Sequence, residues 1–136
     1  MSEKNKISVR LFEVDDYETL CTFWQKHEWQ PLPLVAMPSP YYLAECDGEI
    51  IAGEGLLLSK YNGIGMQEWL VSNPDANPRT VIKAIRKLDE QIEATARNEE
   101  VWALFTYCKQ EGLAKLKKKF GYQETDRDMI HLIKPL

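Results

Sequence analysis

The stretch NPRTVIKAI, residues 77–85, has the composition of a helix start that could hold an anion. Asn77 is a preferred N-cap residue, and Pro78 suits the first helical position because its missing N–H costs least there. The first N–H groups of a helix have no partner within it, and the helix dipole is positive at that end. Arg79 and Lys83 add positive charge. The stretch therefore predicts either an anion site or simply a well-capped helix.

Glu54 is a single carboxylate within an otherwise apolar segment, IIAGEGLLL, with a glycine on each side. A buried charge without a partner is strongly destabilising, so a buried carboxylate must be paired or protonated. Glu54 could therefore receive a cationic substrate. Alternatively, it could pair with a lysine or arginine from a neighbouring strand or loop.

Length and composition indicate one globular domain over residues 1–136, with 44% hydrophobic and 28% charged residues. No segment approaches the roughly 20 apolar residues that cross a bilayer, and the first residues, MSEKNKIS, lack the apolar centre of a signal peptide. We therefore expect a cytoplasmic protein with no membrane partner. The net charge of -4 argues against general nucleic-acid binding.

The three cysteines, Cys21, Cys46 and Cys108, are scattered and form no CxxC or Cys/His cluster. This spacing does not support a disulfide framework or a zinc site. We expect free thiols and no metal.

The first half of the chain predicts a strand, a helix, a loop and a hairpin. Apolar residues alternate over Ile7–Leu11, which is the period of a strand, and Asp15 with Glu18 forms a capping-box pattern that predicts a helix. Four prolines in the segment 31–40 disfavour a helix there. The Asp-Gly pair at 47–48 separates two apolar runs and favours a tight antiparallel turn.

The second half predicts a strand over 66–71, an amphipathic helix over 79–98 and a strand over 101–108. A short helix should then end at Gly121, and a last strand should cover 129–134, MIHLIK. Helices among both antiparallel and parallel strands indicate an α/β fold. We expect a mixed, mostly antiparallel sheet flanked by helices on both faces.

With this element order, the chain resembles the GNAT superfamily, the Gcn5-related N-acetyltransferases, over nearly its whole length. The hairpin DGEIIAG is similar to the family's second and third strands, and LVSNPDANPRTVIKAI to its fourth strand, acetyl-CoA loop and helix start. The segments VWALFTYC and LAKLKKKFGYQETDRDMIHLIK are similar to the remaining elements. The resemblance implies transfer of an acetyl group from acetyl-CoA to an amine of a protein or small molecule.

The family's (Gln/Arg)-x-x-Gly-x-(Gly/Ala) loop brings backbone N–H groups close to the pyrophosphate of coenzyme A. When the chain is anchored on Pro74-Asp75, those three motif positions fall on Asn77, Thr80 and Ile82, and none of them matches. The side chains of Thr80 and Ile82 would occupy space that the cofactor normally uses.

The resemblance still implies that acetyl-CoA is held by this loop and helix start. The N–H groups of Arg79, Thr80 and Val81 could face the anion, while the side chains of Arg79 and Lys83 supply charge that the family's glycines do not.

In the family, a backbone N–H beside a bulge in the fourth strand polarises the thioester carbonyl, which here implies Leu70 or Val71. Glu68 lies where some members carry a base, directly or through water. A register error of one residue would exchange it with Gln67. Otherwise Glu68 is an exposed strand residue.

The family often places an asparagine and, seven residues later, a tyrosine that protonates the leaving thiolate. The corresponding positions are Gln110 and Lys117. Lys117 could stabilise or protonate a thiolate if burial changes its pKa, or it could belong to a solvated lysine face. Tyr107 is either a substitute proton donor or a core aromatic.

Trp29 borders the proline-rich loop, which in the family forms one wall of the acceptor site, and an aromatic wall would suit a peptide or an alkyl amine. The departures from the motif also allow a second interpretation, a non-catalytic GNAT-fold protein. Such a protein, of the kind that tailed bacteriophages encode, would bind a host protein or take a place in a virion. An edge strand at 129–134 could pair two subunits as a homodimer.

Overall fold

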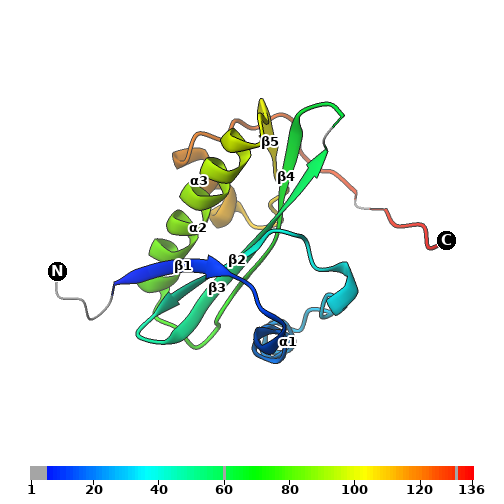
Figure 1. The fold of residues 1–136 in the computed structure, drawn as a ribbon. Coiled ribbons are helices and arrows are strands. Elements are labelled where there is room, and N and C mark those ends of the chain that lie inside the picture. Colours follow the sequence, from blue (N-terminus) through cyan, green and yellow to red (C-terminus); the bar gives the residue numbers. More distant parts are fainter. Residues whose placement is uncertain (1–5, 60, 131) are drawn as a thin grey trace.

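The computed structural model describes residues 6–59, 61–130 and 132–136, and it contains one five-stranded sheet in the order β1-β2-β3-β4-β5 (Figure 1). The first three neighbouring pairs are antiparallel, and β4 and β5 are parallel. The strands are β1 (Ile7–Leu11), β2 (Tyr41–Cys46), β3 (Glu49–Ser59), β4 (Ile64–Ser72) and β5 (Ala103–Phe105). The helices are α1 (Tyr17–Lys26), α2 (Pro78–Asn98) and α3 (Glu111–Lys119), with short 3-10 turns at Val14–Asp16 and Leu34–Ala36.

Helices cover both faces of the sheet, which confirms the predicted fold class (Figure 1). Alternation of side chains along each strand gives the sheet two apolar faces. One core lies under α2 and includes Ala52, Leu56 and Leu88, while the other lies under α1 and includes Leu20 and Leu43. α3 packs beside α2, where the guanidinium of Arg86 lies 5.2 Å from the ring centre of Phe120.

The predicted turns at Asp47-Gly48 and at Gly121 are confirmed. Asp47 and Gly48 have φ angles of +52° and +81°, the left-handed conformation that a two-residue hairpin turn requires. Gly121 has φ +106° just after α3, and its N–H bonds to the carbonyl of Lys118 at 3.1 Å. The hairpin turn and the end of α3 therefore lie at the residues that the sequence predicted.

Two predictions for the first half and the middle of the chain need correction. The capping box lies two residues before the predicted one: Glu13 is the N-cap of the 3-10 turn, and its N–H donates to Asp16 Oδ2 at 2.8 Å. Asp16 is held there by Arg10, whose Nη2 lies 2.7 Å from its Oδ1. The strand predicted over 101–108 is limited to Ala103–Phe105, because β4 and β5 pair over only three residues.

The strand predicted over 129–134 is wrong for the part of that segment that the structure describes. Residues 129, 130 and 132–134 form no strand, and His131 lies outside the described residues. Apolar composition predicted a strand, but a strand also needs a neighbour to bond with, and these five residues have none within the described part of the chain. Among the described residues, no helix combines the length and the apolar character needed to span a membrane.

Gly53 and Gly55 allow the loop before β2 to pack closely on β3. A Cβ at Gly55 would lie 2.7 Å from two ring carbons of Pro38, and a Cβ at Gly53 would lie 2.7 Å from Tyr41 Cε1. Both distances are too short for carbon atoms, so glycine is required on this side of β3.

We therefore expect Gly55→Ala to lower the free energy of unfolding by about 1–3 kcal/mol, because the rigid Pro38 ring cannot move aside easily. Gly112→Ala in α3 is the matched control, since a Cβ there has nothing within 4 Å, and it should be neutral or stabilise by up to about 1 kcal/mol. Urea unfolding measures both. Equal midpoints for the two variants would contradict the packing argument.

Candidate active site

β4 and β5 run side by side for three residues and then part. The pairs are Ile64 with Ala103, Gly65 with Leu104 and Met66 with Phe105. Just beyond these pairs, the hydroxyl of Thr106 donates to the carbonyl of Gln67 at 2.6 Å. Beyond Gln67, β4 has β3 on one side and no strand of residues 6–59, 61–130 or 132–136 on the other.

Just beyond this split, β4 contains a β-bulge. Gly53 of β3 pairs with Val71 and Gly55 pairs with Glu68, so Glu54 alone lies opposite two residues, Trp69 and Leu70. Trp69 has φ +63°, a left-handed conformation that is strained for a bulky residue. The hydroxyl of Tyr41 donates to the Trp69 carbonyl at 2.7 Å and holds the bulge.

Of the two residues that the resemblance implied, the bulge includes Leu70, whereas Val71 is paired with Gly53 just beyond it. Leu70 is half-buried against the α2 core, and Val71 is buried in the α1 core. Their side chains therefore pack on opposite faces of the sheet, so any role in polarising a carbonyl would belong to backbone N–H groups.

Glu68 lies next to the bulge and faces the α1 side of the sheet, because it pairs with Gly55, whose missing side chain points at Pro38. Its Oε1 is buried and has no hydrogen-bond partner among the described residues. Burial raises the pKa of Glu68 to about 7, and the charge of Glu54 adds to the rise, while a hydrogen bond from the Tyr107 backbone and the charge of Lys117 oppose it. Glu68 is thus a half-buried carboxyl group that titrates near neutrality.

The start of α2 is as predicted, with Asn77 as N-cap and Pro78 in the first turn. The expectation for its amides needs correction. The Asn77 side chain accepts a hydrogen bond from the Arg79 N–H at 2.9 Å, and the Asn77 carbonyl accepts one from Val81 at 3.0 Å. Of the three N–H groups expected to face an anion, the Thr80 N–H alone lacks an intramolecular partner within the described chain. An asparagine cap competes with an anion for the amides it bonds.

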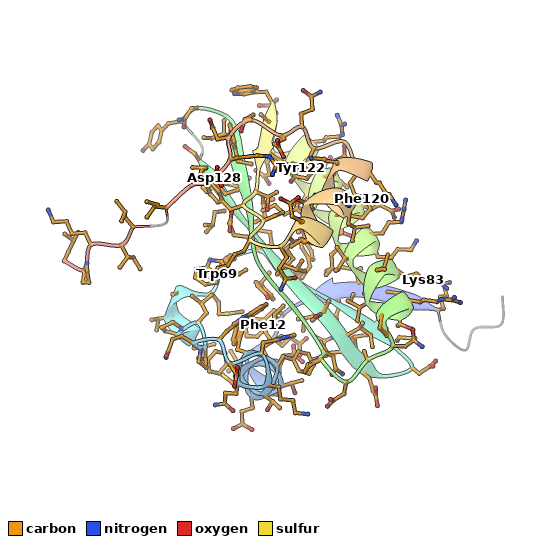
Figure 2. All side chains as sticks on the ribbon, turned by 180° about the vertical axis from the view of Figure 1, so that it is seen from behind. Phe12, Trp69, Lys83, Phe120, Tyr122 and Asp128 are labelled. Atoms are coloured by element: carbon orange, nitrogen blue, oxygen red, sulfur yellow. The ribbon has the colours of Figure 1, made fainter. Side chains whose placement is uncertain are left out.

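The side chains around this helix start are placed as follows. Ile82 is 48% exposed, so its side chain is not packed into the core. Arg79 is exposed and Thr80 half-buried. Lys83 projects from α2 far from Trp69 (Figure 2), and its charge acts on Cys46 at the end of β2. Lys83 therefore lies away from the split strands.

On the other face of the sheet, Glu54 and Lys117 form a buried ion pair. Lys117 Nζ lies 3.0 and 3.2 Å from the two carboxylate oxygens of Glu54 and 3.6 Å from Asp89 Oδ1. Lys117 is 2% exposed and Glu54 is 1% exposed. Of the two roles left open for Glu54, the structure has the pairing with a lysine, and this lysine comes from α3.

Gln67 and Tyr122 complete this buried cluster. The Gln67 amide donates to Glu54 Oε1 at 2.8 Å and to Asp89 Oδ1 at 2.9 Å, and the Tyr122 hydroxyl donates to Gln67 Oε1. Lys117 Nζ also lies 5.8 Å from the centre of the Tyr122 ring. One amide therefore links β3, β4, α2 and the segment after α3.

Two carboxylates share one ammonium in this cluster. Burial raises the pKa of Glu54 and that of Asp89. The charge of Lys117 and the hydrogen bonds from Gln67 and Lys117 oppose this rise, but both pKa values stay above their usual values.

The interpretation of Lys117 as part of a solvated lysine face is wrong, whereas Lys115, Lys118 and Lys119 are exposed as that interpretation expects. Position on the helix explains the difference, because Lys117 lies on the face of α3 that packs against Glu54 and Asp89 and the other three lysines do not.

Tyr107 and Trp29 are surface residues. Tyr107 is 59% exposed, so it is not a core aromatic, and it follows β5 on the segment that parts from β4. Trp29 stacks on His27, with ring centres 4.5 Å apart, on the α1 side of the sheet. Trp69 and Phe12 also lie on that side (Figure 2).

The sequence interpretation missed the roles of Gln67, Asp89 and Tyr122. Asp89 carried a usable signal, because it interrupts the apolar stripe of α2 between Leu88 and Ile92. A carboxylate on a buried helix face needs a cation, as Glu54 does. Two such carboxylates on elements that pack together would have predicted a shared lysine.

Comparison of the structure with solved structures gives similar folds among acetyltransferases. An acetyltransferase from Trypanosoma brucei is 16% identical, with a TM-score of 0.70 over 94% of this chain and 100% of the other. The ribosomal-protein-S18-alanine N-acetyltransferase from Escherichia coli is 12% identical, with a TM-score of 0.70 over 89% and 80% of the two chains. The chain has a GNAT-like fold.

N-acetylglutamate synthase from Neisseria gonorrhoeae, complexed with coenzyme A and N-acetyl-glutamate, is a further GNAT-like neighbour. It is 17% identical, with a TM-score of 0.66 over 92% of this chain and 30% of its own. No protein-family model matches the sequence, and no curated protein does. At these identities the likeness establishes the fold alone.

The buried cluster gives a prediction for this GNAT-like core. Lys117→Met leaves two buried carboxylates without a cation and should lower the free energy of unfolding by about 3–5 kcal/mol. Lys119→Met, in the same helix but exposed, is the control and should change it by no more than about 0.5 kcal/mol. Denaturant unfolding at neutral pH measures both, and adding Glu54→Gln to Lys117→Met should restore part of the loss. Similar losses for Lys117→Met and Lys119→Met would show that the ion pair is not needed.

Proposed function

We propose that the protein is an N-acetyltransferase that uses acetyl-CoA, with an amine of a protein or small molecule as acceptor. The observation that supports this most strongly is Glu68, a carboxyl group with a pKa of about 7 and a buried oxygen without a partner, placed beside the β4 bulge. A general base works best when its pKa is near the working pH. An ordinary surface glutamate would not have this environment.

In this proposal each residue of the site has a defined task. Glu68 takes a proton from the acceptor amine as the amine attacks the acyl carbon, and a backbone N–H at Trp69 or Leu70 binds the oxygen on which negative charge develops. The hydroxyl of Tyr107, a residue that is 59% exposed, donates its own proton to the leaving thiolate and regains one from solvent. We propose a structural role for Lys117, because its ammonium is already shared by Glu54 and Asp89.

Acetyl-CoA, when bound, supplies the activated acetyl group. The residues that fit it are the β4 bulge, the free Thr80 N–H and the exposed guanidinium of Arg79, which can bond a phosphate in a bidentate manner. The caps at Arg79 and Val81 make this a weaker phosphate site than a glycine-rich loop. We therefore propose that binding depends on the Arg79 side chain more than on backbone amides.

Trp29 and Trp69, both partly exposed on the α1 side, are proposed to border the acceptor. Glu68 faces the same side. Apolar walls beside a carboxylate favour an amine with an apolar substituent, such as an alkyl amine or a peptide N-terminus.

The second candidate is a non-catalytic GNAT-fold protein, of the kind that tailed bacteriophages encode, that binds a host protein or takes a place in a virion. The observation that favours it is the engagement of the Arg79 and Val81 N–H groups by Asn77. Binding of acetyl-CoA discriminates between the two candidates.

The first test is the thermal midpoint with and without acetyl-CoA. A ligand at a hundred times its dissociation constant stabilises a fold by about 2.7 kcal/mol, so the midpoint should rise at millimolar acetyl-CoA. Arg79→Gln should weaken binding about tenfold, whereas Lys87→Gln, roughly two turns along the same helix, should not change it. An unmoved midpoint in the unmodified protein would exclude the acetyl-CoA proposal and favour the second candidate.

The second test concerns Glu68. Thiol release from acetyl-CoA, followed with a panel of primary amines, should rise with pH and level off above about 7 as Glu68 loses its proton. Glu68→Gln should lower kcat/KM by about 10²–10⁴-fold and remove this ionisation, while Glu90→Gln on the exposed face of α2 should do neither. If the pH profile persists in Glu68→Gln, another group is the base.

A further inference from the structure

The chain turns back on itself at the end of α1, at a strained residue. Glu28 has φ +62°, a left-handed conformation that glycine usually supplies after a helix. The N–H of Trp29 donates to the carbonyl of Trp24 at 2.8 Å. The N–H of Glu28 donates to the carbonyl of Gln25 at 2.9 Å, and the two bonds form a Schellman motif. This turn stacks the Trp29 ring on the His27 ring, with the two planes 19° apart.

The half-buried His27 ring is also bonded to β4. Its Nε2 lies 2.9 Å from the backbone oxygen of Ser72, the last residue of that strand. Because a carbonyl oxygen only accepts, Nε2 carries the hydrogen and donates. Ser72 leads directly into the loop 73–77 at the start of α2. One ring therefore contacts both the proposed acceptor wall, at Trp29, and the strand end that begins the proposed cofactor loop.

Two side chains on the α1 side of the sheet hold the last residues of β4. The Tyr41 hydroxyl donates to the Trp69 carbonyl at 2.7 Å, and the His27 ring donates to the Ser72 carbonyl. The backbone N–H groups proposed to bind the developing oxyanion, at Trp69 and Leu70, lie on the segment between these two bonds. Such donors are effective when their positions are fixed before the reaction. A shift of Ser72 would therefore displace them.

A second link joins α1 to the same loop, but it is exposed. Lys26 Nζ binds Asp75 Oδ2, and at least half of each side chain is open to solvent. Exposed ion pairs of this kind contribute little, because water and salt screen them. The bond from His27 is shielded by the stacked Trp29 ring, so it is the stronger mechanical connection of the two.

We propose that His27 is a positioning residue that couples the acceptor wall to the cofactor loop, so that an amine seated against Trp29 strengthens the binding of coenzyme A. The inference rests on the proposed acetyl transfer and adds a dependence between its two ligands. An amine that packs on Trp29 fixes the stacked ring, and the ring fixes Ser72. The second ligand then meets a loop that is already ordered. The coupling is reciprocal, so coenzyme A strengthens amine binding by the same factor.

Titration calorimetry of coenzyme A, with and without excess hexylamine, measures this coupling. Hexylamine is an alkyl amine of the class that the site favours, and coenzyme A carries no acetyl group, so no turnover occurs. In the unmodified protein, hexylamine should lower the dissociation constant of coenzyme A about fivefold or more. His27→Gln keeps a donor for the Ser72 carbonyl but has no ring to stack. It should bind coenzyme A alone as the unmodified protein does, with a coupling factor close to one, a split that a merely structural role would not produce.

Two further variants separate the bond from the stack and from the exposed ion pair. His27→Phe keeps the stack and loses the donor, so it should weaken coenzyme A alone by about two- to tenfold and also remove the coupling. Lys26→Gln, on the same helix, breaks the exposed pair with Asp75 and should leave the factor unchanged. Circular dichroism establishes that each variant is folded, and if one His27 variant unfolds, the other carries the test.

The outcomes distinguish this inference from the proposed function. If coenzyme A binds but hexylamine has no effect on its affinity, or if the factor is the same in His27→Gln, the coupling is overturned and the acetyl transfer is not. An equal loss of coupling in Lys26→Gln would also overturn it, because the general docking of α1 would then be responsible. An unmodified protein that does not bind coenzyme A would overturn both proposals.

Discussion

The ammonium of Lys117 lies between two buried carboxylates, Glu54 and Asp89, that could not remain charged without it. Gln67 bonds to both carboxylates, so the four side chains fix the positions of β3, β4, α2 and α3 relative to one another. Breaking such a pair costs far more than an exposed salt bridge contributes. The placement of α3 against the sheet, and hence of the chain that follows it, depends on this cluster.

Two neighbouring residues of β4, Gln67 and Glu68, have different roles because their side chains lie on opposite faces of the sheet. Gln67 points into the buried cluster on one face, and Glu68 points to the α1 side on the other. The bulge at Trp69 and Leu70 follows directly, held by Tyr41 from β2. The charge of Glu54 contributes to the raised pKa of Glu68, so the structural cluster and the proposed base are electrostatically linked through the sheet.

The start of α2 illustrates a conflict between helix capping and anion binding. Asn77 satisfies the Arg79 amide, which makes a stable helix start, but the same bond removes a donor that a phosphate could use. A glycine-rich loop leaves such donors free at a cost in backbone entropy. This chain has the more stable start, so a phosphate there would depend on side-chain charge.

The sequence alone determined the features that depend on local chemistry: the fold class, the Asp47-Gly48 turn, the Asn77 cap and the end of α3 at Gly121. It also showed that Glu54, if buried, needs a partner. Only the tertiary structure decided that this partner is Lys117, that the bulge falls at Trp69 and Leu70, and that residues 129, 130 and 132–134 form no strand with the described part of the chain. Those outcomes depend on which residues distant in sequence meet, and the spacing of residues along one chain does not contain that information.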